Sequence, residues 1–539
     1  IKIRINLKLK NKIIYTIMEY TSILFIGSNK LINFTDFFFK RDNILKLVGT
    51  AAIANYCITT LGYDKKYLLY LLKKIPYIKN EINEKKQKIR QEIKDDLNEP
   101  IKNLKINYKI PQNGLEENKV LEEITSYSKL LGYDSNQGKI SGCVYSNSKK
   151  IDRLMAQVFP LFERTNPLHP DIYPGVRKME AEIVNMCGNL MKSVYPQAGC
   201  FTSGGTESII LAMRSYKMIA KERGIKGDIL LAKSAHAAYW KAAEYFDMNT
   251  IEIDTVEEPL DDIFIENHIT RDTIVIIASA PSFNFGIVDD IKNISDFCFK
   301  NHIYLHVDMC LGGFLLPFLD NMEVDFTQLG ISSISMDTHK YGYGPKGGSV
   351  LLYRDPYLVK KHCFIKEDWT GGIYGTSNLT GSRSGAVIAL TWSTMMSIGI
   401  SGYTEEANRI QKMVIALRND INKNNNLFVY GNPKICIVGI GTIDFNIYLL
   451  TDKLKDKGWS LNILQNPPGF HFCITSVHTM DNIKQLIYDI NYSTKDIMEN
   501  EDKLTIQPVS IYGTTQKVKD GDIISDVVRE YISCLNELK

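Results

Sequence analysis

The feature that most constrains the fold of this chain is an alternation of short apolar runs with helix-length amphipathic segments between residues 228 and 354. Runs of this length that are rich in Ile, Val and Leu are typical of buried strands. They are DILLAK (228–233), TIEID (250–254), TIVIIASA (273–280), IYLHVD (303–308), SSISMD (332–337) and GSVLLY (348–353). The alternation predicts an α/β fold with a mostly parallel sheet covered by helices on both faces. Ligands of such sheets bind at the carboxyl ends of the strands.

The rest of the chain predicts further regions around this sheet, because 539 residues exceed a single hydrophobic core. A long apolar helix is expected near 384–399, and the Asn- and Lys-rich stretch at 422–426 marks a boundary. After it come strand and helix patterns ending in a helix near Leu538. We therefore expect an N-terminal segment (1–70), a helical segment (71–195), a large α/β domain (196–420) and a small α+β domain (421–539).

A stretch near the N-terminus is a candidate membrane anchor. The run at 44–63 has about the 20 residues needed to cross a bilayer, but it contains Lys46 and several polar residues. Lysines and an arginine between 65 and 90 would suit the cytosolic flank of such an anchor. A solvated amphipathic helix explains the same residues, so both interpretations stay open.

Charge and cysteine content argue against several classes of function. The 64 basic and 61 acidic residues give a net charge of +3, which is too balanced for nucleic acid as the main partner. The ten cysteines include no CxxC pair, so neither a zinc site nor a disulfide framework is indicated. Reduced thiols in the cytosol are the simpler interpretation, and no metal site is predicted.

A glycine pair before a helical pattern is the first candidate ligand site. In CFTSGGTESIILAMRSYK (200–217), Gly204 and Gly205 precede apolar residues at helical spacing. The free N–H groups of a helix N-terminus can bind a phosphate group, and the hydroxyls of Ser203, Thr206 or Ser208 could add donors. An ordinary capped helix begins in the same way, so the motif alone leaves both interpretations open.

Two charged residues follow neighbouring apolar runs. Asp308 ends the run at 303–308, where a carboxylate can pair with a protonated ring nitrogen. Lys340 follows the run at 332–337 and lies beside His339 in a glycine- and tyrosine-rich turn. Burial there is expected to lower the pKa of Lys340 and to favour the neutral amine, which can form a Schiff base. Taken alone, a capping aspartate and a surface lysine are the simpler interpretations.

His236 follows the run at 228–233, which is expected to be the first strand of the sheet. Its imidazole could stack on a planar ring, although a buried structural histidine is equally plausible by itself. Together, the glycine loop, His236, Asp308 and Lys340 occur in the order and near the spacing of fold type I pyridoxal-phosphate enzymes. This conjunction predicts pyridoxal 5′-phosphate as the cofactor.

Longer motifs resemble those of the sphingosine-1-phosphate lyases, a branch of the group II decarboxylase superfamily. The resemblance runs from about Leu71 to the C-terminus. Its most specific stretches are SGCVYSNSKK (141–150), NPLHPDIYPGVRKMEAEIV (166–184), FTSGGTESI (201–209), SMDTHKYGYGPKG (335–347) and WTGGIYGTSNLTGSRSG (369–385). The resemblance implies a large domain of the pyridoxal-phosphate-dependent transferase type (fold type I). It also implies retro-aldol cleavage of phosphorylated long-chain (sphingoid) bases to a fatty aldehyde and phosphoethanolamine.

The resemblance further implies a role for each matching residue. Lys340 would carry the cofactor, Asp308 would pair with its ring nitrogen and His236 would stack on the ring. The residues implied for the cofactor phosphate are Ser203, Gly204, Gly205, Thr206 and His339. Those implied for the substrate are Tyr145, Asn166, His169, Lys346 and Tyr374, of which Lys346 and Tyr374 would also take part in catalysis. Tyr374 is the first candidate for the proton transfers.

Assembly and location follow from the same resemblance. Some substrate-side residues would reach a site at a dimer interface, which implies a homodimer. The anchor at 44–63 would tether the protein to the endoplasmic reticulum membrane, with its catalytic domain in the cytosol.

Two alternative functions remain open at the level of sequence. An amino-acid decarboxylase of the same superfamily would use the same lysine, aspartate and histidine, although the NPLHPD and GGIYGT segments favour the lyase. A non-catalytic, membrane-tethered homologue is the other alternative. The intact Lys340, Asp308 and His236 argue against it.

Overall fold

The computed structural model describes residues 76–130, 132–255, 257–320, 323–500 and 521–538. They belong to two compact units, one of residues 133–504 and one of residues 1–132 with 505–539. The N-terminal segment at 1–70, with the candidate anchor at 44–63, lies outside the described residues. The predicted boundaries at 195/196 and 420/421 fall inside the larger unit and stay a prediction.

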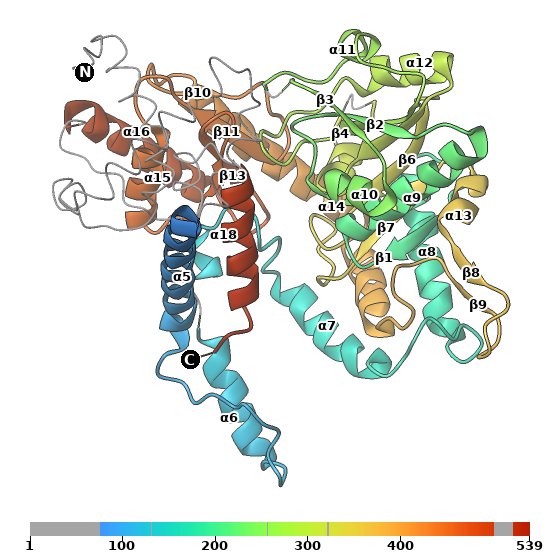
Figure 1. Ribbon diagram of the computed structural model, residues 1–539, viewed down its shortest axis with the longest axis horizontal. Coiled ribbons are helices and arrows are strands. Elements are labelled where there is room, and N and C mark those ends of the chain that lie inside the picture. The colour runs from blue at the N-terminus through green and yellow to red at the C-terminus, as the bar shows by residue number, and fades with distance from the viewer. Residues whose placement is uncertain (1–75, 131, 256, 321–322, 501–520, 539) are drawn as a thin grey trace, which may run out of the picture. The chain divides into compact units, whose positions relative to one another are not determined.

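A seven-stranded sheet forms the centre of the larger unit (Figure 1). Its strands, in spatial order, are β1 (Gly199–Thr202), β7 (Ser349–Tyr353), β6 (Ile331–Met336), β5 (Tyr304–Asp308), β4 (Thr273–Ser279), β2 (Asp228–Ala232) and β3 (Thr250–Ile253). The neighbours from β6 to β3 are parallel, whereas β7 is antiparallel to both β6 and β1. The six predicted strands and the mostly parallel sheet are thus confirmed.

Strand β1 was not predicted from the apolar runs. It has only four residues and pairs with β7 at the edge of the sheet, so it lacks the long apolar run of a central strand. The run at 228–233 was expected to be the first strand of the sheet. It is the second, because β1 precedes it in the chain.

Alternate residues of the strands pack against helices on opposite faces. Ile229 and Leu231 belong to an apolar cluster with residues of α9 (Gly205–Arg223) and α10 (Ala238–Phe246). Leu230 lies in a second cluster with residues of other helices. Those helices are α8 (Pro174–Leu190), α11 (Asp262–Glu266), α12 (Ile291–Asn301) and α14 (Gly385–Ile421). Because successive side chains of a strand point to opposite faces, both faces of the sheet are covered.

Helix α14 follows the central sheet in the chain and precedes a second, antiparallel sheet of four strands. Its two helical parts meet at Gly399, where φ is 65°, so the apolar helix expected at 384–399 ends at this kink and a second part follows. Helix α7 (Lys149–Phe162) packs along it. Among the described residues, α14 alone has the length and composition of a membrane span. Half of its most apolar window is buried in the protein, as in the core helix of a globular domain.

The residues after α14 form a small antiparallel sheet with two helices. The strands are β10 (Phe428–Val429), β11 (Ile437–Gly441), β13 (Gly469–Cys473) and β12 (Asn462–Leu464), in that order. Helices α15 (Ile447–Asp456) and α16 (Met480–Asn500) pack together beside it. Buried Phe470 and Trp459 fill its core, and the Trp459 indole donates to Asp489 at 2.9 Å. This agrees with the α+β arrangement predicted for the region.

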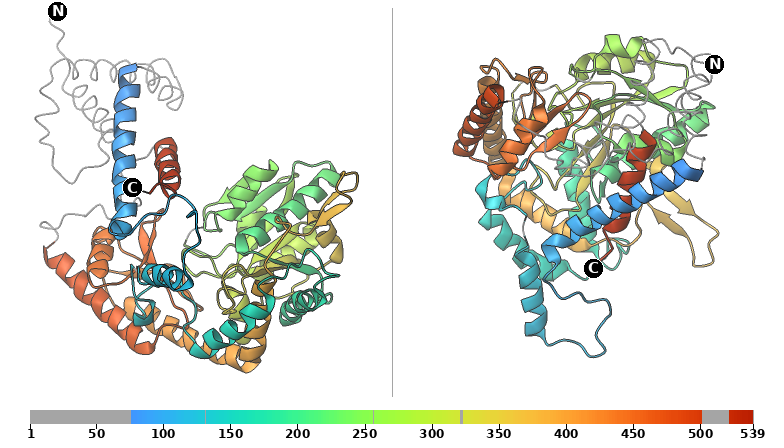
Figure 2. Two further views of the ribbon diagram at one scale, coloured as in Figure 1. Left: turned by 90° about the horizontal axis from the view of Figure 1, so that it is seen from below. Right: turned by 60° about the vertical axis from the view of Figure 1, so that its left-hand side comes forward.

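The smaller unit brings the two ends of the described chain together. Helix α5 (Pro76–Asn98) lies beside α18 (Gly521–Cys534), and Figure 2 shows the two helices from two sides. Arg90 forms ion pairs with Glu530 and Glu537, and Lys86 pairs with Asp526 at 2.6 Å. The unit also contains α6 (Glu117–Ser128). The terminal helix ends at Cys534, four residues before the predicted Leu538.

Candidate active site

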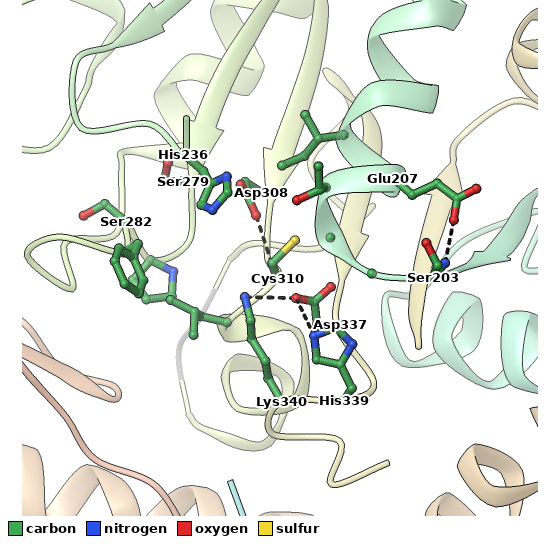
Figure 3. A pocket seen from close by; sticks show the side chains of 17 residues that line it. Ser203, Glu207, His236, Ser279, Ser282, Asp308, Cys310, Asp337, His339 and Lys340 are labelled. Carbon is green, nitrogen blue, oxygen red and sulfur yellow. Dashed lines mark hydrogen bonds and ion pairs between the residues drawn. The ribbon is translucent and has the colours of Figure 1, made fainter. Parts of the chain in front are cut away.

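A cavity of about 470 Å³ lies at the carboxyl ends of the central parallel strands (Figure 3). Ser279 ends β4, Asp308 ends β5 and Asp337 directly follows β6, and all three line it. The eight residues predicted for the cofactor also line it: Ser203, Gly204, Gly205, Thr206, His236, Asp308, His339 and Lys340. The sheet thus brings together residues that are up to 137 positions apart in the chain, from Ser203 to Lys340.

The glycine loop forms a close-fitting cradle at the N-terminus of α9. Gly204 has φ of 152°, and Gly205 is the first residue of the helix. A Cβ on Gly205 would lie 2.7 Å from the Cys310 Sγ and 2.9 Å from Asp337 Oδ1, so only glycine fits. The first N–H groups of a helix have no intrahelical partner, which makes this cradle suitable for a phosphate group.

Glu207 fixes the loop from within the helix. Its side chain is buried and accepts a hydrogen bond from the Ser203 N–H at 2.6 Å and one from the Leu379 N–H at 2.8 Å. One carboxylate therefore connects the glycine loop with the segment that follows Tyr374.

Asp308 is a buried, ionised acceptor. Its Oδ2 accepts from the Tyr239 hydroxyl at 3.2 Å, and its Oδ1 accepts from the Cys310 N–H at 3.0 Å. Burial raises the pKa of Asp308, but nearby His236 and the hydrogen bonds of Cys310 outweigh it, so the pKa lies below its ordinary value. A carboxylate held in this form suits pairing with a cationic ring nitrogen.

Lys340 forms an ion pair that the sequence did not indicate. Its Nζ lies 2.9 Å from Asp337 Oδ2 in the turn after β6. Burial lowers the pKa of Lys340, but the charge of Asp337 outweighs it and the pKa is raised above its ordinary value. The expectation that Lys340 has a lowered pKa and a neutral amine was therefore wrong. The local ion pair, and not desolvation, sets the charge of this lysine.

His339 faces the same carboxylate. Its Nδ1 accepts from the Gly348 N–H at 3.2 Å, and its Nε2 lies 3.6 Å from Asp337 Oδ2. The pKa of His339 lies below its ordinary value, mainly because the ring is largely buried. The neutral ring therefore carries its proton on Nε2.

Two of the substrate-side residues lie next to the Lys340 turn. The Lys346 Nζ is 4.6 Å from the ring centroid of Tyr145, and that ring contacts Tyr341 edge-on at 5.1 Å. Burial is the main cause that raises the pKa of Tyr145, while burial and the charge of Lys340 lower the pKa of Lys346. Neither Tyr145 nor Lys346 is among the described residues that line the cavity.

The other three substrate-side residues lie on loops and on a hairpin. The Asn166 side chain accepts from the Leu168 N–H at 3.1 Å and donates to Ser382 at 3.0 Å, which ties two loops together. His169 is exposed. Tyr374 begins β9 (Tyr374–Thr376), which pairs with β8 (Phe364–Lys366). Within the described part of the chain, the cavity lining contains none of these three residues.

Among the residues that line or support the cavity, the sequence did not single out Asp337, Glu207, Cys310 or Tyr239 as site residues. Asp337 stands three positions before Lys340 at the end of a strand, and that position was the available signal. Glu207 follows the glycine pair inside the same motif. Tyr239 has no comparable signal, because its contact with Asp308 joins residues 69 positions apart.

The residues around the cavity fit pyridoxal phosphate. A glycine cradle at a helix N-terminus suits its phosphate, an ionised buried carboxylate suits its ring nitrogen, and a lysine amine and an imidazole face the same space.

Comparison with known proteins agrees with this geometry. Residues 100–442 match the pyridoxal-dependent decarboxylase conserved domain. Sphingosine-1-phosphate lyase 1 of Mus musculus is 37% identical over 87% of this chain and 84% of its own length. The sphingosine-1-phosphate lyase of Saccharomyces cerevisiae is 33% identical over 100% of this chain and 92% of its own.

A solved structure supports the same assignment. The sphingosine-1-phosphate lyase of Burkholderia pseudomallei superposes with a TM-score of 0.69 at 32% identity, over 73% of this chain and 94% of that one. The predicted fold type I architecture and pyridoxal-phosphate cofactor are confirmed. The chain therefore belongs to the sphingosine-1-phosphate lyases, a family of pyridoxal-phosphate-dependent enzymes.

Proposed function

We propose that this chain cleaves phosphorylated long-chain bases, such as sphingosine 1-phosphate, to a long-chain aldehyde and phosphoethanolamine. The observation that carries the proposal is the meeting of Lys340, Asp308 and the glycine cradle in one cavity of a chain from this family. When bound, pyridoxal phosphate supplies an electron sink for the electron pair of the broken carbon–carbon bond.

Each cavity residue has a stated task in this proposal. Lys340 would hold the cofactor through Nζ, and the Asp308 carboxylate would keep a proton on its ring nitrogen. The glycine loop, with Ser203, Thr206 and His339, binds the cofactor phosphate. His236 stacks on the ring.

The substrate side rests on the five residues outside the cavity lining. Lys346, Tyr145 and His169 bind the substrate phosphate, for which an ammonium, a phenol and an imidazole are suitable donors. Asn166 orients the substrate. Tyr374, or a group that it positions, moves the proton at the substrate hydroxyl.

We further propose that these residues complete the site only in a homodimer. The β8–β9 hairpin that carries Tyr374 and the residues just after it expose several large apolar side chains to solvent. They are Phe364 (49% exposed), Ile365 (64%), Trp369 (54%), Ile373 (83%) and Leu379 (55%). Large exposed apolar side chains in one short segment support a protein interface. For location, we propose the endoplasmic reticulum membrane, with the anchor at 44–63 and a cytosolic catalytic part.

Product analysis tests the function. Purified full-length protein is incubated with a phosphorylated long-chain base, and fatty aldehyde and phosphoethanolamine are quantified. Carbon dioxide from an amino acid, with no aldehyde from the lipid, would support a decarboxylase instead. A protein that releases neither aldehyde nor carbon dioxide, and that has no visible cofactor absorption, would be a non-catalytic homologue.

A further inference from the structure

The cavity lining also contains the buried carboxylate of Asp337, to which the proposed function gives no task. Its side chain is 2% exposed, and its Oδ2 lies 2.9 Å from the Lys340 Nζ (Figure 3). Its Oδ1 is buried and has no hydrogen-bond partner among the residues that the structure describes. This second oxygen faces the glycine cradle, 2.9 Å from where a Cβ of Gly205 would stand.

The surroundings of Lys340 make Asp337 its counter-ion. The ionisable groups whose charges raise the pKa of the Lys340 amine are Asp337, Cys310 and Tyr145. The charge of Lys340 in turn lowers the pKa of Lys346. His339 presents its Nε2 to the same carboxylate oxygen at 3.6 Å. Burial raises the pKa of both the Cys310 thiol and the Tyr145 phenol, so these two groups stay neutral near pH 8. The negative charge next to Nζ therefore comes from Asp337.

A buried carboxylate without a cation is costly, as is a buried ammonium without an anion. Asp337 and Lys340 remove both costs with one short contact in a turn of four residues. The contact also fixes where Nζ lies when it is not bonded to anything else.

We propose that Asp337 is a positioning residue that holds Lys340 as an ammonium ion whenever its Nζ carries no covalent bond. The consequence for turnover rests on the proposed function. There, the substrate nitrogen would replace Nζ on the carbon that Nζ holds: both carbon–nitrogen bonds to Nζ would break as two form to the substrate nitrogen, and the two protons that the substrate ammonium loses would balance the two that Nζ gains on becoming an ammonium. An ammonium has no free electron pair, so Lys340 held by Asp337 cannot compete with the substrate amine for the same carbon.

The test measures the charge of Lys340 directly, without substrate. Cofactor-free full-length protein is treated with an amine-acetylating reagent from pH 7 to pH 10, and modification of the Lys340 peptide is quantified by mass spectrometry. We expect Asp337→Asn to speed acetylation of Lys340 at pH 8 by at least about tenfold, since a shift of one pKa unit changes the neutral fraction tenfold. Asp337→Glu, which keeps the carboxylate, should restore slow labelling.

A matched control uses another buried aspartate that pairs with a lysine. Asp325 is 7% exposed and lies 2.7 Å from the Lys192 Nζ, and it does not belong to the cavity lining in the described part of the chain. Asp325→Asn should leave the labelling of Lys340 unchanged.

Equal labelling of Lys340 in folded wild-type protein and Asp337→Asn, judged by near-ultraviolet circular dichroism, would overturn the proposal. If the variant does not fold, the pH dependence of labelling in the wild-type protein tests the proposal by itself. Lys340 must then be labelled with a midpoint at higher pH than exposed Lys150, and a midpoint at or below that of Lys150 contradicts the proposal. Failure of wild-type protein to release aldehyde would instead refute the proposed function and leave the labelling result valid.

Discussion

The two halves of the candidate site are built in different ways. The cofactor half lies at the ends of β4, β5 and β6, where buried Asp308 and half-buried Lys340 are held by partners within 3.2 Å. The substrate half is spread over loops, the surroundings of the Lys340 turn and a hairpin whose strands have three residues each. A central parallel sheet can position charged groups within one chain, whereas short surface elements gain precision when another surface covers them.

The largest expected effect tests the cofactor half. Lys340→Ala removes the amine that carries the cofactor, so visible cofactor absorption should disappear. Turnover should fall by more than about 10⁴-fold, as when a covalent catalyst is removed. Absorption spectra and aldehyde release measure the two results. Full retained turnover would contradict the mechanism.

A substitution in the substrate half should separate binding of the cofactor from chemistry. Tyr374→Phe removes one hydroxyl and keeps the ring that packs against Trp369 and Phe364. We expect unchanged cofactor absorption with a rate lower by about 10² to 10⁴, the usual contribution of a positioned proton donor or acceptor. Unchanged kinetics would exclude this tyrosine.

The hairpin tests whether the substrate half needs a second copy. Ile373 is 83% exposed, and Ile373→Asp should weaken a dimer by at least about tenfold, because a charge would have to be buried. Sedimentation should show more monomer, and turnover should fall with the dimer fraction while cofactor absorption stays. Ile443→Asp is the matched control, since Ile443 is 91% exposed and lies off the hairpin. A dimer unaffected by Ile373→Asp would remove the hairpin from the interface.

The same division explains what could be predicted from the sequence. Burial on both faces gives the central strands β2, β4 and β5 largely apolar runs, so the sheet and the positions of Asp308 and Lys340 followed from pattern. The edge strand β1 has four residues and no such run. The charge of Lys340 was mispredicted because it depends on the contact with Asp337, which periodicity does not encode. The task of Tyr374 stays a prediction, because Tyr374 is not among the described residues that line the cavity.

A smaller effect is expected from the support of Asp308. Tyr239→Phe removes a hydroxyl that donates to Asp308 at 3.2 Å, in a cavity wall that is otherwise unchanged. Because a hydrogen bond to a charged group contributes about 1.5–3 kcal/mol, cofactor affinity should fall by about 10- to 150-fold. Equilibrium titration of cofactor-free protein, followed by absorption, measures it. An unchanged affinity would show that the Cys310 N–H and His236 suffice to hold the carboxylate.

The pH dependence of substrate binding is the mildest test and concerns Lys346. Burial and the positive charge of Lys340 hold the pKa of Lys346 below its ordinary value of 10.5. If its ammonium binds the substrate phosphate, binding is complete below this lowered pKa and is lost as the pH rises through it. The KM should therefore begin to rise at a lower pH than for an ordinary lysine, by up to tenfold per pH unit beyond the pKa.

The matched variant for this test is Lys346→Arg, because a guanidinium stays charged throughout the accessible pH range. Its KM should stay flat where that of the wild-type protein rises, whatever its absolute value. The same rise in both proteins would assign the titration to another group and remove Lys346 from the phosphate site. A flat KM in the arginine variant alone would assign the titration to Lys346. The pH dependence of substrate binding would then depend on the cofactor half of the site, because the charge of Lys340 helps to lower the pKa of Lys346.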